Sequence, residues 1–168
     1  NFKFEKLEII FIDDGSTDDT LNVLEIFKNN PQIQIHSKEN GGKYTALNFG
    51  IENSNSDLVG CLDADSFVEK DALKNMIPYF ENKKIMAVVP AIKVHGANNL
   101  LQKMQNVEYN WSIFVRKILT YLNALHITPG PFTIFRRKVF ENIGKYKHAY
   151  LTEDLEMALR MQENHYKI

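Results

Sequence analysis

Short apolar runs rich in β-branched residues alternate along this chain with segments that have the apolar spacing of amphipathic helices. The runs expected to form strands cover residues 9–12, 33–35, 58–62 and 85–92. Helical spacing is found between them, at residues 21–27, 44–52 and 72–80. This alternation predicts an α/β fold, with a mainly parallel sheet flanked by helices. Ligands bind such sheets at the carboxyl ends of the strands, so the residues that follow each strand are candidates for a functional site.

Several local signals predict where the helices begin, bend and end. Side-chain oxygens for capping the first helix are available at Ser16, Thr17 and Asp18. A bend is expected near Pro78. A short helix that begins near Arg137 should end at Gly144. The final helix should be capped by Thr152 and run to about Asn164, with its inward positions at Leu155, Leu159 and Met161.

Composition limits the class of protein. The 168 residues suit one compact domain, and 44% of them are hydrophobic, enough for a buried core. The net charge of −1 provides no field that would attract nucleic acid, so nucleotide binding would have to rely on a metal ion or on loop amides. The one cysteine, Cys61, excludes an intrachain disulfide and is expected to be a buried, reduced thiol.

The two ends of the chain look interrupted. No apolar run reaches the roughly 20 residues that a membrane helix needs. Residues 1–8 are a charged segment directly before a strand, and residues 166–168 have the pattern of the start of another strand. We therefore expect the chain to be part of a longer protein.

A pair of aspartates, Asp63 and Asp65, follows the strand expected at residues 58–62. Two carboxylates one residue apart at the end of a strand can converge on one hard cation, and Mg²⁺ or Mn²⁺ prefers such oxygen ligands. A metal there would neutralise a diphosphate as it leaves. The alternative is an ordinary acidic loop start or helix cap.

Two further motifs are each ambiguous when taken alone. Asp13 and Asp14 precede Gly15, which fits either a turn with capping side chains or a carboxylate that accepts hydrogen bonds from a base or ribose. Lys43 follows a Gly-Gly pair without the spacing of a P-loop, so it is either a solvated surface lysine or a phosphate ligand.

The segment Thr152-Glu153-Asp154 begins the last helix. A threonine cap with acids in the first turn is ordinary capping and dipole chemistry. The functional reading makes one of the acids a general base, because a sugar hydroxyl is a poor nucleophile until a carboxylate takes its proton. The helix N-terminus would then lower the pKa of Asp154. The five histidines have no metal-ligand spacing.

The order of these motifs is more specific than any one of them. Asp-Asp-Gly-Ser-x-Asp, Gly-Gly-Lys-x-x-Ala-Leu-Asn, Asp-x-Asp, Gly-x-Phe-x-x-Phe-Arg-Arg and Thr-Glu-Asp follow one another at residues 13–18, 41–48, 63–65, 130–137 and 152–154. This series resembles family 2 glycosyltransferases with the GT-A fold. It looks most similar to the membrane-embedded processive synthases of poly-N-acetylglucosamine, hyaluronan, chitin and cellulose.

The resemblance implies roles on the donor side. It predicts a UDP-sugar donor, a Mg²⁺ or Mn²⁺ ion, and the following sites: Asp14 or Asp13 at the uracil, Lys43 near the diphosphate, Asp63 at the nucleotide and the metal, and Asp65 at the metal. It also implies two halves of a single catalytic domain fragment that spans residues 1–168. Residues 1–95 would bind the nucleotide-sugar and residues 96–168 would face the acceptor.

On the acceptor side, the resemblance implies that Asp154 is the general base, with Glu153 beside it. The family inverts the anomeric centre in one displacement, so no covalent nucleophile is needed. The sugar would be N-acetylglucosamine or another hexose, and the acceptor a growing polysaccharide or another saccharide. No nucleic acid partner is expected.

The resemblance also implies a location. The complete protein would work at the cytoplasmic face of the cell membrane, held there by parts outside this fragment, which itself would be soluble. A long helical stretch at residues 100–125 looks like the segment at the membrane interface in those synthases. Its apolar stripe would face a bilayer surface or membrane helices, and the alternative is that it packs into the domain's own core. The stripe consists of Val107, Trp111, Phe114, Val115, Ile118, Leu122 and Leu125.

Two family segments are not found in this chain: the first strand, with its Pro-x-Tyr-Asn-Glu-like end, and the Gln-x-x-Arg-Trp motif. A non-catalytic nucleotide-sugar-binding module or degenerate homologue therefore remains an alternative. A nucleotidyltransferase is a further alternative, although the Gly-rich phosphate loop usual near its start is absent.

Overall fold

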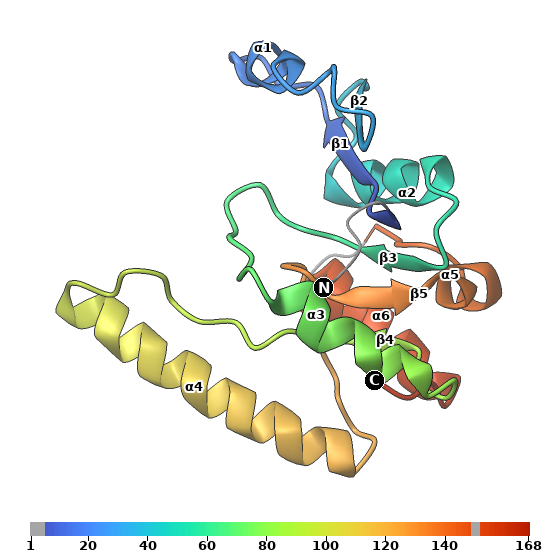
Figure 1. The fold of residues 1–168 in the computed structure, drawn as a ribbon. Helices are drawn as coiled ribbons and strands as arrows, with labels where there is room; N and C mark the ends of the chain where they lie inside the picture. Colours follow the sequence, from blue (N-terminus) through green and yellow to red (C-terminus); the bar gives the residue numbers. More distant parts are fainter. Residues whose placement is uncertain (1–5, 149–151) are drawn as a thin grey trace.

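The computed structural model describes residues 6–148 and 152–168. Strands and helices alternate through the first half of the chain, and helices dominate the second half (Figure 1). The elements are β1 (Ile9–Asp13), α1 (Thr20–Glu25), β2 (Ile33–Ser37), α2 (Lys43–Asn53), β3 (Leu58–Gly60), α3 (Ala72–Met76), the 3₁₀ helix η2 (Ile77–Glu81), β4 (Ala87–Val88), α4 (Leu100–Tyr121), β5 (Ile134–Arg136), α5 (Arg137–Ile143) and α6 (Glu153–Glu163).

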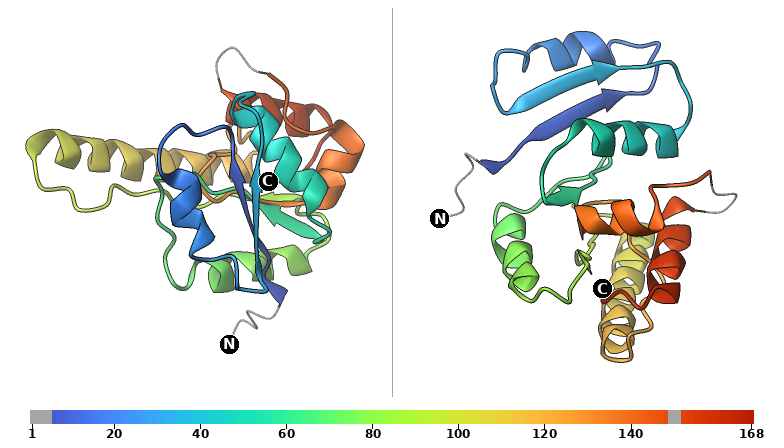
Figure 2. Two further views of the ribbon diagram at one scale, coloured as in Figure 1. Left: turned by 90° about the horizontal axis from the view of Figure 1, so that it is seen from above. Right: turned by 90° about the vertical axis from the view of Figure 1, so that its right-hand side faces the viewer.

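The strands of the described residues pair in two sheets. β1 and β2 are parallel, with Ile9 opposite Ile33 and Asp13 opposite Ser37. β5 lies between β3 and β4 and is antiparallel to both, so β3 and β4 run in the same direction. Helix α2 lies between the two sheets (Figures 1 and 2). The α/β arrangement is as expected, but β5 interrupts the parallel order because it re-enters the sheet after the long excursion through α4.

Prolines explain two of the differences from the expected elements. Strand β4 has two residues instead of the eight expected at 85–92. Pro90 has no N–H to donate, so the ladder cannot continue through it. Pro78 has the expected effect, because α3 gives way there to the 3₁₀ helix η2.

The cap expected for the first helix is confirmed in part, because Oδ1 of Asp18 accepts a hydrogen bond at 3.1 Å from the amide of Thr20, the first residue of α1. Asp19 is the N-cap residue of α1, and its side chain accepts no capping hydrogen bond. The amide of Ser16 is instead bonded to the carboxylate of Asp13, 3.2 Å away, so Ser16 belongs to the turn after β1. The final helix behaves as expected, since Thr152 Oγ1 accepts a hydrogen bond from the amide of Leu155.

The main core joins α2, the three-stranded sheet, α5 and α6. Its fully buried members include Phe135, Val139, Met157 and Met161. Met157 and Met161 are four residues apart and therefore lie on one face of α6. Leu159, which we expected to point inward, is 48% exposed because it lies on the other side of that helix.

The arginines of the Phe-Arg-Arg stretch bind main-chain carbonyls. Arg137 donates from Nε to the carbonyl of Ser56 at 2.7 Å and from Nη1 to that of Ile51 at 3.1 Å. Arg136 donates from Nε to the carbonyl of Ile85 at 2.8 Å. The two side chains therefore tie the segments that precede β3 and β4 to β5 and to the start of α5.

Helix α4 projects from the body of the molecule (Figure 2), and large apolar residues on one of its faces, such as Val107 and Phe114, are exposed. It begins with a capping box between Asn99 and Gln102. Trp111 is 65% exposed, so within the described residues the stripe does not pack into the domain's own core as one alternative had it. Leu125 is the exception in that stripe, since it is buried beyond the end of the helix. None of the helices within residues 6–148 and 152–168 is long and apolar enough to cross a membrane.

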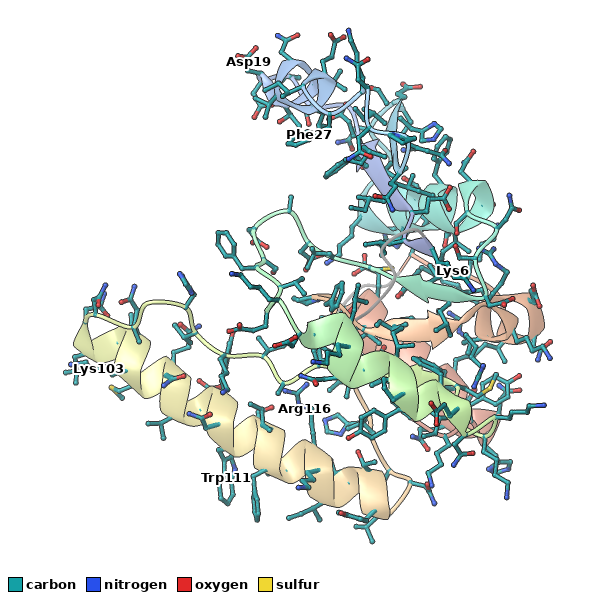
Figure 3. All side chains as sticks on the ribbon, viewed as in Figure 1. Lys6, Asp19, Phe27, Lys103, Trp111 and Arg116 are labelled. Carbon is teal, nitrogen blue, oxygen red and sulfur yellow. The ribbon has the colours of Figure 1, made fainter. Side chains whose placement is uncertain are left out.

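Arg116 lies on the opposite side of α4 from Trp111 and points toward the rest of the chain (Figure 3). It is buried, and its Nη1 lies 3.4 Å from the carbonyl of Pro90. Burial lowers the pKa of Arg116. The helix therefore has one face turned toward the domain and one face uncovered.

Candidate active site

Three of the predicted site residues meet around Gly130. A Cβ atom built on Gly130 would lie 3.1 Å from Nζ of Lys43 and 3.2 Å from Oδ2 of both Asp63 and Asp154. Lys43 begins α2, Asp63 follows β3, and Asp154 lies in the first turn of α6. Motifs that are up to 111 positions apart in the chain thus converge at one point, at the carboxyl end of β3.

Lys43 and Asp63 form an ion pair at the centre of this group. Nζ of Lys43 lies 2.7 Å from Oδ1 of Asp63. Burial would lower the pKa of Lys43. The hydrogen bond to Asp63 and the negative charges of that residue, Asp154 and Glu153 outweigh burial and raise this pKa. Lys43 is therefore a permanent cation among acids, as a diphosphate ligand would be.

Asp14 holds the loop that leads to Lys43. Its carboxylate accepts hydrogen bonds from the amides of Gly41 and Gly42, at 3.1 and 2.9 Å, and from Nζ of Lys38 at 2.5 Å. The bond to Lys38 is the main reason that the pKa of Asp14 is lowered. Gly42, at φ +87°, has a backbone conformation that favours glycine. Asp14 and the Gly-Gly pair therefore place the first residue of α2.

Asp13 holds the acidic turn itself. It is buried and accepts hydrogen bonds from the amide of Ser16 and, at 3.0 Å, from Oγ of Ser37. The hydrogen bond with Ser16 is the largest cause of its lowered pKa. Both acids expected at the uracil thus already have protein donors, and contact with a base remains a prediction. Lys38 was not predicted as a site residue, although its position just after β2 is a signal that could have pointed to it.

Asp154 is held at both its main chain and its side chain. The amide of Gly130 donates to Oδ2 of Asp154 at 2.7 Å. The Thr128 hydroxyl donates to the main-chain carbonyl of Asp154 at 2.9 Å. Thr128 was not predicted as a site residue, because its contact is with a residue 26 positions away in the chain.

The expected effect of the helix N-terminus on Asp154 was wrong. Burial raises the pKa of Asp154, and the amide of Gly130 and the charge of Lys43 only partly oppose this. The negative charges of Asp63 and Glu153 raise the pKa further. A raised pKa makes the carboxylate a stronger proton acceptor, which suits a general base.

The second aspartate of the pair lies outside this convergence. Asp65 is exposed, and its Oδ1 accepts a hydrogen bond from Oγ of Ser66 at 3.3 Å. Within the described ranges, no group of three or more His, Cys, Asp and Glu side chains could hold a metal ion. The donor set of Asp63 and Asp65 still fits Mg²⁺, which usually takes one or two carboxylates and completes its shell with water and substrate phosphate oxygens.

A buried thiol lies beside the site. Sγ of Cys61 is 3.9 Å from the hydroxyl of Tyr146, and burial raises the pKa of Cys61 to about 11. The thiol is therefore protonated at neutral pH and unreactive. Cys61 is a free cysteine, as expected, but the residue as a whole is only partly buried.

Comparison with known families decides the affiliation of the chain. The family model described as Glycosyl transferase family 2 matches residues 1–144. This chain belongs to glycosyl transferase family 2. The resemblance inferred from the order of the motifs is therefore confirmed.

Curated relatives in this family include poly-beta-1,6-N-acetyl-D-glucosamine synthases. That of Staphylococcus aureus (strain COL) is 35% identical over 169 residues, which cover 99% of this chain and 41% of the relative. That of Staphylococcus epidermidis (strain ATCC 35984) is 31% identical over 171 residues, which cover 100% of this chain and 42% of the relative. The chain thus spans about two fifths of the length of these relatives.

Solved structures show the same fold. The mannosyltransferase PcManGT from Pyrobaculum calidifontis, in complex with GDP-Man and Mn²⁺, matches with a TM-score of 0.70 at 19% identity, over 99% of this chain and 46% of that chain. Residues 1–349 of TarS from S. aureus, in complex with UDP, match with a TM-score of 0.68 at 18% identity, over 95% of this chain and 46% of that chain. This family 2 domain therefore has the GT-A fold that the motifs predicted.

The space at Gly130 gives a first prediction. In Gly130→Ala, a methyl group would lie 3.1 to 3.2 Å from Lys43, Asp63 and Asp154, closer than side chains normally pack. We expect sugar transfer to fall about tenfold or more, because small displacements of reacting groups are costly. Steady-state transfer assays, with thermal melting to confirm folding, measure this.

The matched control is Gly50→Ala, in α2. A Cβ on Gly50 would meet only Cγ1 of Ile12, at 3.7 Å, which is an ordinary contact. This variant should keep full activity and melt at the same or a higher temperature, since alanine favours helix. Wild-type activity in Gly130→Ala would show that the three groups do not act together.

Proposed function

We propose that this family 2 domain catalyses the transfer of a sugar from a UDP-sugar to a saccharide acceptor, with inversion at the anomeric carbon. The convergence of Lys43, Asp63 and Asp154 around Gly130 carries this proposal. It brings together a cation, which would bind the diphosphate, and a carboxylate, which would take the proton of the acceptor.

On the donor side, Asp63 and Asp65 would hold a Mg²⁺ or Mn²⁺ ion. When bound, the ion would neutralise negative charge on the diphosphate. Lys43 would add its own charge, exchanging part of its contact with Asp63 for a phosphate oxygen. The complexes of the two structural neighbours, one with GDP-Man and Mn²⁺ and one with UDP, support a nucleotide site of this kind.

On the acceptor side, Asp154 would take the proton of the attacking hydroxyl. The amide of Gly130 occupies Oδ2, which leaves Oδ1 for the acceptor. The acceptor oxygen forms a bond to the anomeric carbon as the bond from that carbon to the diphosphate breaks. The diphosphate leaves with the bonding electrons and the proton stays on Asp154, so a single displacement inverts the centre.

For the sugar we propose N-acetylglucosamine, and for the acceptor a growing polysaccharide, because both Staphylococcus relatives bear the name of such a synthase. We propose that the two halves of the domain have different roles, the first in binding the nucleotide-sugar and the second in facing the acceptor. Residues 1–95 supply Lys43, Asp63 and Asp65, and residues 96–168 supply Gly130 and Asp154.

Turnover decides between an enzyme and a binding module. The protein expressed from its complete reading frame would be incubated with a panel of UDP-sugars, and release of UDP and growth of saccharide would be followed. We expect transfer with UDP-N-acetylglucosamine. UDP binding without transfer from any donor would favour the non-catalytic alternative.

The uncovered face of α4 supports a membrane-side location. Trp111, Val107 and Phe114 are 65%, 69% and 55% exposed, which is unusual for large apolar side chains on one helix face. Helices of this kind lie in the membrane interface with the apolar face inward. We therefore propose that α4 rests on the cytoplasmic face of a bilayer.

Trp111 is the one tryptophan among these 168 residues, so in a protein made of them its fluorescence reports on this contact. Its fluorescence should shift to shorter wavelength when lipid vesicles are added. Val107→Glu should weaken vesicle binding about tenfold, from the apolar burial it removes. Ser112→Glu, which adds the same charge at an exposed position of α4 away from the apolar stripe, is the control and should bind more tightly than Val107→Glu. Unchanged Trp111 emission with vesicles would rule out the bilayer contact.

A further inference from the structure

Residues 125–130, which we call the strap, connect the end of α4 to β5 and run along α6. Three hydrogen-bonding residues tie the strap to that helix. The carbonyl of Leu125 accepts from Nε2 of Gln162 at 3.0 Å, near the end of α6. Thr128 and Gly130 both bond to Asp154, in its first turn. The strap is therefore anchored to α6 at both ends, and one anchor is the candidate base.

Thr128 makes the most specific of these contacts. Its side chain is 1% exposed, and its hydroxyl donates to the main-chain carbonyl of Asp154 at 2.9 Å. The amide of Thr128 donates to the same carbonyl at 3.3 Å. A hydroxyl this deeply buried is costly unless it is hydrogen-bonded, so its bond to Asp154 is needed for a well-packed strap.

The two contacts with Asp154 act on different parts of that residue. Thr128 fixes the main chain, and the amide of Gly130 fixes the carboxylate. Together these two contacts hold Oδ2 of Asp154 at the space that Lys43 and Asp63 also border. A base that shifts by about an ångström loses much of its effect.

We propose that Thr128 is a positioning residue for catalysis, and that its hydroxyl sets the place of the Asp154 carboxylate through the main chain of α6. This inference rests on the proposed function, in which Asp154 is the general base. It goes further because it gives a catalytic consequence to a buried threonine that no motif contains.

The test compares Thr128→Val, which removes the hydroxyl, with Thr128→Ser, which keeps it. In the protein from its complete reading frame, Thr128→Val should lower kcat about tenfold while KM for the UDP-sugar stays within about twofold. Thr128→Ser should stay within about twofold of wild type in both. If Thr128→Val does not fold, as judged by melting, Thr128→Ala serves in its place.

A double-mutant cycle separates positioning from general loss of structure. In an Asp154→Asn background, Thr128→Val should lower the residual rate by less than about twofold, because its effect passes through the Asp154 carboxylate. The control is Thr120→Val in α4, whose hydroxyl also donates to a main-chain carbonyl, that of Arg116, at 3.0 Å. That variant should keep wild-type kcat.

The outcomes are distinct. If the wild type transfers no sugar, the proposed function fails. If the wild type is active and Thr128→Val retains full kcat, this inference alone is overturned. The same holds if Thr128→Val lowers the transfer rate by the same factor in the wild-type and the Asp154→Asn backgrounds.

Discussion

Replacing Asp154 with asparagine should cut sugar transfer by roughly a hundredfold or more, the usual effect of losing a general base, while UDP-sugar affinity stays within a few-fold. Asparagine keeps the shape of the side chain and an oxygen for the amide of Gly130, but it cannot take a proton. The structure strengthens this expectation, because burial raises the pKa of Asp154 and so makes it a better base than an exposed aspartate.

The same raised pKa predicts the effect on stability. Because the folded-state pKa of Asp154 is raised, its ionised form opposes folding at pH values above that pKa, and this opposition is relieved as the pH falls through it. Asp154→Asn removes the buried charge, so at neutral pH the variant should melt at the same or a higher temperature than wild type. Loss of activity would then not be due to unfolding.

Two matched variants test the assignment of the base. Glu153→Gln, one residue away, should keep most of the transfer rate. Asp63→Asn should weaken donor binding first, because Asp63 is paired with Lys43 on the donor side. If Asp154→Asn turned over at a near-normal rate, the role would pass to Glu153 or to a residue outside this chain.

Local signals predicted the elements that hold the site. The Thr152 cap and the helix after it were confirmed, as was the helix that follows Gly41 and Gly42. Caps and helix starts depend on residues within a few positions of each other, so they can be predicted from a single sequence. The ends of strands were less predictable, and the early end of β4 depended on Pro90.

Properties set by distant contacts were not predictable. The pKa of Asp154 was expected to fall, but burial under the strap raises it. Arg137 looks like an ordinary charged residue in the sequence, yet it binds carbonyls more than 80 positions away. The order of the motifs predicted the right family, although it did not show which residues contact one another.

The surroundings of the apolar face of α4 were also not predictable from the sequence. A helical stripe of large apolar residues fits a core and a membrane surface equally well in one sequence. Within the described residues the structure excludes packing of the stripe into the core, since Arg116 lies on the side that faces the domain and Trp111 is left outside (Figure 3). Helical spacing located the stripe but not what covers it.

Removing divalent metal should weaken UDP binding by about a hundredfold. The charges around the site support this expectation. Asp63, Asp65, Glu153 and Asp154 are all acidic, and Lys43, the cation that borders the space at Gly130, is already paired with Asp63 at 2.7 Å. A diphosphate brought to such a site meets net repulsion, which at these separations amounts to several kcal/mol unless a cation lies between the charges.

Calorimetry measures this directly, by titration of UDP with excess Mg²⁺ or Mn²⁺ and then with EDTA. Asp65→Asn should mimic EDTA in part, since the exposed carboxylate of Asp65, which accepts a hydrogen bond from Oγ of Ser66, would also bind the metal under the proposed function. The control, Asp71→Asn, removes an exposed acid that is 3.9 Å from Lys74, and it should bind UDP as wild type does. Equal affinity with metal and with EDTA would mean that Lys43 alone neutralises the diphosphate. Asp63 would then serve to position Lys43 rather than to bind a metal.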